Sequence, residues 1–154
     1  MPEAQDILVQ IYEEVMWLAR RPNVTPGNAR AWYTHVWSQK LRRQVRYFSG
    51  RVSRAAIDAP VGERLALEHY GRIQAGLSEL VERHLRDQIS DPAEFCRTII
   101  EKEKVHIVTE VENRRLQHSR ADYTTLGIVL IDWVCIPPDR QERLWMRKLQ
   151  GHVA

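Results

Sequence analysis

The residues KVHIVTEVE, Lys104 to Glu112, mark the point at which the helical pattern of the chain gives way to a strand. Val105, Ile107 and Val108 are β-branched residues in close succession, and such residues favour extended backbone. Thr109 and Glu112 then have the spacing of a capping box, in which two side chains bond each other's backbone amides at a helix start. The stretch therefore predicts a strand over 105–108 and a short helix from Thr109 to about His118.

A second strand is predicted over 127–134, where GIVLIDWV is an almost continuous apolar run typical of a strand buried on both faces. Pro137 and Pro138 end it, and the spacing of apolar residues over 139–149 predicts a last amphipathic helix. Because a strand, a helix and a strand in succession favour a right-handed crossover, we expect two parallel strands. Two strands make an incomplete sheet, so we expect flanking helices to cover them or a second copy of the chain to complete them.

The chain before Lys104 has helical periodicity. A helix is predicted over 3–20, and Thr25-Pro26 starts a second one to about Ser49, with Gly50 either capping it or lying inside a helix that continues to Ile57. Two more are predicted over 61–89 and, from an Asp91–Glu94 capping box, 92–103. The predicted fold class is α+β and mainly helical: one domain over 1–154, with an N-terminal bundle of three to four helices (1–103) followed by a small β-α-β-α unit (104–154).

The composition is that of a globular protein, since 44% of the residues are hydrophobic and 28% are charged. The first residues lack the basic and apolar segments of a signal peptide, and the longest apolar run is too short to span a bilayer. We therefore expect a cytoplasmic protein without membrane contact. Cys96 and Cys135 have apolar neighbours and no CxxC spacing, which predicts two buried free thiols.

Charge is distributed unevenly along the chain. Residues 1–14 contain four acids and no base, whereas residues 15–57 contain nine bases and no acid, although the net charge is only +3. An ordinary solvated surface mixes the two signs. A segment of this length without an acid therefore favours a polyanionic partner, DNA or RNA.

On the predicted second helix, Trp37, Leu41 and Val45 form an apolar stripe and the bases lie on the opposite side. Cations along a rigid helix, with aromatic rings among them, suit the phosphates and the stacked bases of a nucleic acid. The predicted nucleic-acid-binding residues are Arg30, Lys40, Arg42, Arg43, Arg46, Tyr47, Arg51 and Arg54. The leading hypothesis is a non-enzymatic nucleic-acid-binding accessory protein. The alternative for this surface is that its bases pair with acids from Asp58 onward.

Two other function classes stay open. A protein-interaction subunit or homodimer would use the incomplete sheet and the five tryptophans, because at least one of Trp17 and Trp32 falls off the apolar stripe of its helix. A metal-dependent nuclease or hydrolase would use Glu110 and Asp132. If the two strands are parallel, both carboxylates lie near strand carboxyl ends, where they could hold Mg²⁺.

No established catalytic motif is present. His106, Asn113 and His118 are spaced too tightly for a His-Asn-His nuclease, so His106 is expected to be a hydrogen-bonded strand residue. The chain contains no phosphate loop, no GxGxxG and no nucleophile elbow. The sequence accordingly predicts no catalytic residue, no metal ligand and no cofactor.

Overall fold

The computed structural model describes residues 3–69, 71–119 and 121–154, which form a mainly helical α+β protein as predicted. Contacts between residues divide it into two compact units. Unit 1 consists of residues 3–47, 71–103 and 154, and unit 2 of residues 48–69, 104–119 and 121–153. The prediction of one domain over 1–154 stays a prediction. The proposed division at residue 103 is too simple, because residues 48–69 belong with the C-terminal part.

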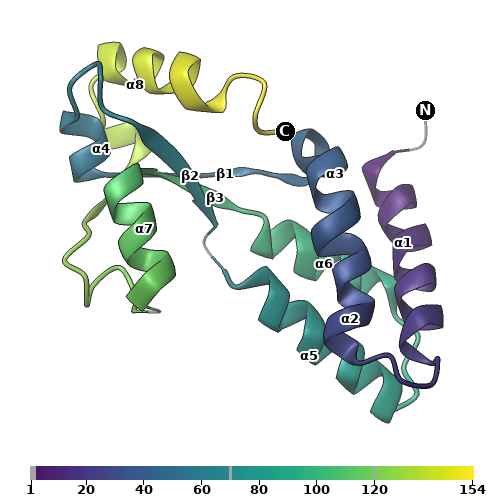
Figure 1. Ribbon diagram of the computed structural model, residues 1–154. Helices are drawn as coiled ribbons and strands as arrows, with labels where there is room; N and C mark the ends of the chain where they lie inside the picture. Colours follow the sequence, from purple (N-terminus) through teal and green to yellow (C-terminus); the bar gives the residue numbers. More distant parts are fainter. Residues whose placement is uncertain (1–2, 70, 120) are drawn as a thin grey trace. The chain divides into compact units, whose positions relative to one another are not determined.

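Unit 1 is a bundle of helices around one apolar core (Figure 1). Thr25 caps α2 by accepting a bond from the Asn28 amide at 3.2 Å, and Asp91 caps α6 by accepting one from the Glu94 amide at 3.0 Å. Both predicted helix starts are confirmed. Its helical elements are α1 (Ala4–Ala19), α2 (Pro26–Ala31), η1 (Trp32–Trp37), α3 (Ser38–Val45), α5 (Ile73–Arg86) and α6 (Pro92–Lys102), with η1 a π-helical segment.

The second helix ends earlier than predicted. α3 ends at Val45, and the chain continues as the strand β1 (Phe48–Ser53) and the short helix α4 (Arg54–Asp58). Gly50 is neither a helix cap nor a helix-interior residue, because it lies inside β1 with a φ of +80°. Phe48 and Val52 continue the helical apolar spacing, but residues that are four positions apart can also lie on one face of a strand. Pairing with β3 decides between the two.

The predicted helix over 61–89 is wrong in its first part. Leu65 to His69 form the strand β2 (Leu65–His69), and α5 begins only at Ile73. β2 pairs with β3 along its whole length, from Leu65 opposite Thr109 to His69 opposite Val105. The backbone bonds of this pairing stabilise a segment whose local spacing alone favours a helix.

Unit 2 contains a four-stranded sheet with the order β2-β3-β1-β4. β3 (Val105–Thr109) is fully buried and lies between β2, to which it is antiparallel, and β1, to which it is parallel. The predicted strand over 127–134 is reduced to β4 (Leu130–Asp132), followed by the 3₁₀ turn η2 (Trp133–Cys135). The prediction that β3 and β4 are parallel neighbours is wrong, because β4 pairs antiparallel with β1. The strands that complete the sheet come from the chain itself.

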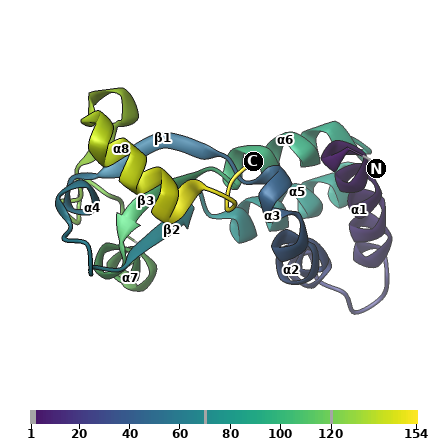
Figure 2. The same cartoon turned by 90° about the horizontal axis from the view of Figure 1, so that it is seen from above.

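Helices cover the two faces of this sheet. The helix α8 (Pro138–Leu144) and the π-helical η3 (Trp145–Leu149) lie over one face, and α7 (Glu110–Ser119) lies on the other (Figures 1 and 2). Leu144 and Leu149 pack in one core cluster with Val52, Leu65 and Ile107. The predicted capping box of α7 is confirmed in both directions, since the Glu112 amide donates to Thr109 Oγ1 at 3.1 Å and the Thr109 amide to Glu112 Oε2 at 2.9 Å.

Cys96 is buried, as predicted, and burial raises the pKa of its thiol. Cys135 is exposed at the end of η2, so the prediction of two buried thiols is wrong for this residue. Within the described ranges, every helix is too short or too polar to cross a membrane.

Candidate functional site

The predicted basic residues do not share one helix. Because α3 ends at Val45, the prediction of a continuous basic helical face is wrong. Arg30, Lys40, Arg42, Arg43, Arg46 and Tyr47 belong to unit 1, whereas Arg51 and Arg54 belong to unit 2. The predicted surface is therefore two groups of residues, one in each unit.

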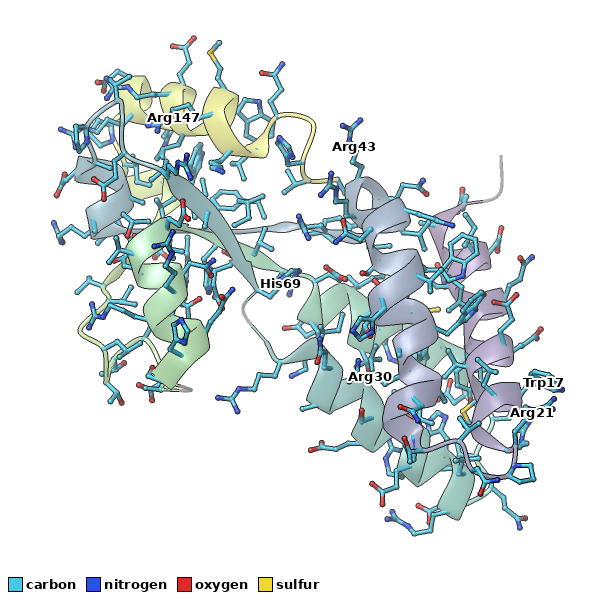
Figure 3. The ribbon with its side chains drawn as sticks, viewed as in Figure 1. Trp17, Arg21, Arg30, Arg43, His69 and Arg147 are labelled. Atoms are coloured by element: carbon cyan, nitrogen blue, oxygen red, sulfur yellow. The ribbon has the colours of Figure 1, made fainter. Side chains whose placement is uncertain are left out.

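Lys40, Arg42 and Arg43 form what we call the α3 basic surface. Lys40 and Arg43 are exposed and one helical turn apart, and Arg42 is half-buried beside them. Figure 3 shows Arg43 projecting from the end of α3. The Lys40 ammonium lies 4.9 Å from the centre of the Trp37 ring, which holds it by a cation–π contact. Among the described residues, no carboxylate lies within ion-pair distance of these three bases.

Arg30 is hydrogen-bonded inside unit 1, and Arg46 is partly buried there, its Nε lacking a hydrogen-bond partner among the described residues. Arg30 donates to Ser78 Oγ at 3.2 Å and to Thr34 Oγ1 at 2.8 Å. Arg46 is half-buried, and burial lowers the pKa of its guanidinium, an effect that the charge of Glu103 opposes. The buried Glu103 also accepts a bond from the Tyr33 hydroxyl at 2.9 Å. Tyr47, which follows Arg46 in the sequence, is exposed.

In unit 2, Arg51 is neutralised by the neighbouring strand. It lies on β1 opposite Asp132 of β4, and its Nε is 3.3 Å from an Asp132 carboxylate oxygen. This pairing confirms the alternative interpretation for Arg51, that it meets an acid from the later part of the chain. Arg54 is the first residue of α4 and is exposed.

Glu110 and Asp132 do not form a metal site. Glu110 begins α7 after the end of β3, whereas Asp132 lies on β4, which is antiparallel to β1 and separated from β3 by it. Each carboxylate has an arginine partner: Arg114 Nη2 lies 2.7 Å from Glu110 Oε1, and Arg51 pairs with Asp132. In the part of the chain that the structure describes, no group of three or more metal-binding side chains gathers.

A polar cluster on the sheet of unit 2 was not predicted. Glu68 of β2 lies opposite His106 of β3, and Ser49 of β1 reaches His106 Nδ1 from the other side at 2.5 Å. The Tyr123 hydroxyl donates to Glu68, and the Tyr123 ring meets the His106 ring edge-on at 5.3 Å between centroids. His106 is thus a hydrogen-bonded strand residue, as expected. Glu68 was missed as its neighbour because residues 65–69 were predicted to be helical and because the pairing of β2 with β3 is set by tertiary structure.

The environment of this polar cluster shifts two pKa values. Burial, aided by the charge of Arg51, lowers the pKa of His106 to about 4, so its imidazole is neutral at pH 7. Burial also raises the pKa of Glu68, although the bond from Tyr123 acts in the opposite direction. A neutral imidazole beside a serine hydroxyl can accept a proton. The bonds seen here are nevertheless made within the cluster and join three strands and a loop, which is what a structural network does.

Comparison of the chain with models of known protein families, with curated proteins and with solved structures gives no match. The chemistry of the residues is therefore the guide to function.

Proposed function

We propose that the protein binds nucleic acid, as an accessory protein, through the α3 basic surface. The observation that supports this proposal is that Lys40, Arg42 and Arg43 have no carboxylate partner among the residues described, in a segment of the chain without a single acid. Other bases of the same segment are held by groups of the protein, Arg51 by Asp132 and Arg30 by two hydroxyls. Since no carboxylate of the described residues pairs with the three bases of α3, their positive charge can attract an external anion.

The form of the surface suits a phosphate backbone. Lys40 and Arg43 are one turn apart on a helix anchored by the buried Leu41 and Val45, so their charges are held at a defined spacing. Gln39 and Gln44 lie on the same two turns and add neutral hydrogen-bonding groups without negative charge. The exposed ring of Tyr47, just beyond the helix, is available to stack on a base of a single strand.

The test is a titration of fluorescently labelled single- and double-stranded DNA and RNA at several salt concentrations. If three bases contact phosphates, the logarithm of duplex affinity should fall against the logarithm of salt with a slope of about −3. The variant Lys40→Glu/Arg43→Glu should lower affinity by about tenfold or more and flatten this slope.

The control is Arg64→Glu/Arg143→Glu, which makes the same change of net charge at two bases of unit 2. It should retain most of the affinity of the wild-type protein. Equal losses in the two double variants would show a non-specific charge effect, and equal binding by the α3 variant and the wild type would contradict the proposal. Circular dichroism of both variants checks that the helices remain.

Association with a protein is the second candidate function, because apolar side chains are exposed on unit 2. Val134 is 86% exposed, and Met146 and Trp145 of η3 are 64% and 45% exposed. Exposed apolar side chains mark a contact with another protein where they form a contiguous patch. Sedimentation velocity over a range of concentrations tests self-association, and a monomer throughout would exclude a homodimer at those concentrations.

A further inference from the structure

A cavity of about 570 Å³ opens on the surface of unit 1 and is lined by Glu13, Glu14, Trp17, Leu18 and Trp32. Its surface is almost wholly apolar, although two of the residues that line it are acidic. None of the residues that line it belongs to the α3 basic surface. Its volume lies within the range of small-ligand sites.

Two elements build this cavity. α1 contributes four of the residues from two successive turns, and Trp32 stands at the start of η1. The Trp32 indole is oriented by a bond from its Nε1 to Glu14 Oε2 at 2.5 Å, and its ring packs edge-on against Trp37 at 6.4 Å between centroids. Trp17 is 58% exposed. The cavity therefore presents one fixed and one solvent-facing indole.

The charges around the cavity favour a positive ligand. Over the described ranges, Glu13 and Glu14 have no base within ion-pair distance, and residues 3–19 contain four acids and no base. Trp17 already binds a cation of the protein, because the Arg21 guanidinium is 4.6 Å from the centre of its ring (Figure 3). This indole thus accepts a cation in the protein itself.

We propose that this cavity binds an organic cation, an alkylated ammonium group whose carbon substituents fill the apolar walls while its charge faces the indoles and the two carboxylates. A neutral apolar ligand would remove water from Glu13 and Glu14 without compensation, and an anion would be repelled by them. An alkylated ammonium suits both the apolar walls and the two carboxylates, because its carbon substituents are apolar and the group as a whole is positively charged. Such a group occurs in free small molecules and on methylated lysine side chains.

The test is isothermal titration calorimetry of the intact protein with choline and with its neutral carbon isostere, in which a tert-butyl group replaces the trimethylammonium group. Choline should bind, and the isostere should bind at least about tenfold more weakly. A short peptide containing trimethyllysine, titrated beside the unmodified peptide, distinguishes the sources: stronger binding than choline assigns the ligand to a protein, and weaker binding to a free small molecule.

Two variants locate the site. Trp17→Leu keeps an apolar wall but removes the indole, and Glu13→Gln removes one charge while keeping size; each should weaken choline binding by about fivefold to tenfold. Trp145→Leu, at an exposed tryptophan of unit 2, is the matched control and should leave it unchanged. Absence of choline binding, equal binding of the neutral isostere, or unchanged affinity in Trp17→Leu would each overturn the proposal.

Discussion

Gly50 shows how one residue controls the path of the chain in unit 2. It has a φ of +80° inside β1, where the register against β3 shifts between Phe48 and Val52. L-residues rarely adopt this conformation, whereas glycine does so without a steric cost. The shift places extra backbone in β1 and lets Ser49 face His106.

Gly50→Ala should lower the free energy of unfolding by about 1 kcal/mol, because alanine resists the positive φ. A Cβ atom at this position would meet nothing within 4 Å, so backbone strain is the only expected cause. Gly62→Ala is the matched control, since Gly62 has equally open surroundings without a positive φ. Urea denaturation of both variants measures the difference, and equal effects would contradict the explanation.

His106 makes the stability of the protein depend on pH. Its folded-state pKa of about 4 lies below the ordinary value of 6.5, so on acidification the unfolded chain takes up the proton first. The contribution of His106 is fully present above pH 6.5 and is lost as the pH falls towards 4. The total loss is on the order of 3 kcal/mol by linkage.

In His106→Gln, the free energy of unfolding should therefore fall less steeply between pH 6.5 and 4 than in the wild type, even if the variant is less stable at pH 7. Glu68 acts with the opposite sign: its raised pKa means that its ionised form destabilises the fold at neutral pH, a cost that disappears on acidification. Chemical denaturation across this pH range provides the curves. Parallel curves for the two proteins would show that His106 does not titrate as described.

At the scale of elements, a chain of hydrogen bonds joins α1, α5 and α6. The Asp91 amide donates to the Tyr12 hydroxyl at 3.2 Å, Tyr12 contacts His84 Nδ1 at 2.7 Å, and His84 Nε2 contacts Glu94 Oε2 at 2.8 Å. Arg83 pairs with the same carboxylate. Tyr12 and His84 are buried, so polar groups that would be costly if unpaired are satisfied by one another.

Tyr12→Phe should lower the free energy of unfolding by about 1–3 kcal/mol, because it leaves His84 Nδ1 and the Asp91 amide without their partner. Tyr47→Phe removes the hydroxyl of an exposed tyrosine and should change stability by no more than about 0.5 kcal/mol. Thermal and urea unfolding of the two variants compares these losses. A similar small effect of both substitutions would show that the buried network contributes little.

The starts of helices were predictable, and two of the strands were not. Thr25, Asp91 and Thr109 cap their helices as expected, since a cap depends on residues only a few positions away. β1 and β2 lie in segments predicted to be helical, because their strand state depends on pairing with β3, far along the chain. The bases of α3 could be predicted because the absence of acids around them is visible in the local sequence. The burial of Arg46 and the pairing of Arg51 with Asp132 could not be predicted, because they depend on residues far away in the chain.

At the scale of the whole molecule, the two units are interleaved in sequence. Every described residue of unit 1 except Ala154 precedes Lys104, yet the central strand β3 of unit 2 follows it. β2 pairs only with β3 among the described strands, and β1 pairs with β3 and β4. The segment 48–69 therefore depends on strands that follow residue 103 in the sequence.

A fragment that ends at Glu103 should keep the helices of unit 1 but lose the structure of residues 48–69, because β1 and β2 lose all their strand partners. Limited digestion with trypsin should cleave it after Arg51, Arg54 or Arg64 much faster than the full chain. Mass spectrometry identifies the sites, and circular dichroism reports the helices. Equal protection in fragment and full chain would show that this segment holds its structure without β3.

The amino-acid sequence by itself determined the helix caps, the strand that begins at Val105, the mainly helical α+β class and the separation of acids from bases. These features depend on neighbouring residues or on composition, so they can be inferred locally. Tertiary structure alone decided that Phe48–Ser53 and Leu65–His69 are strands, that β4 lies antiparallel beside β1, and which bases keep their charge exposed. The reason is that the hydrogen bonds and carboxylates responsible come from residues distant in the chain, which no local pattern specifies.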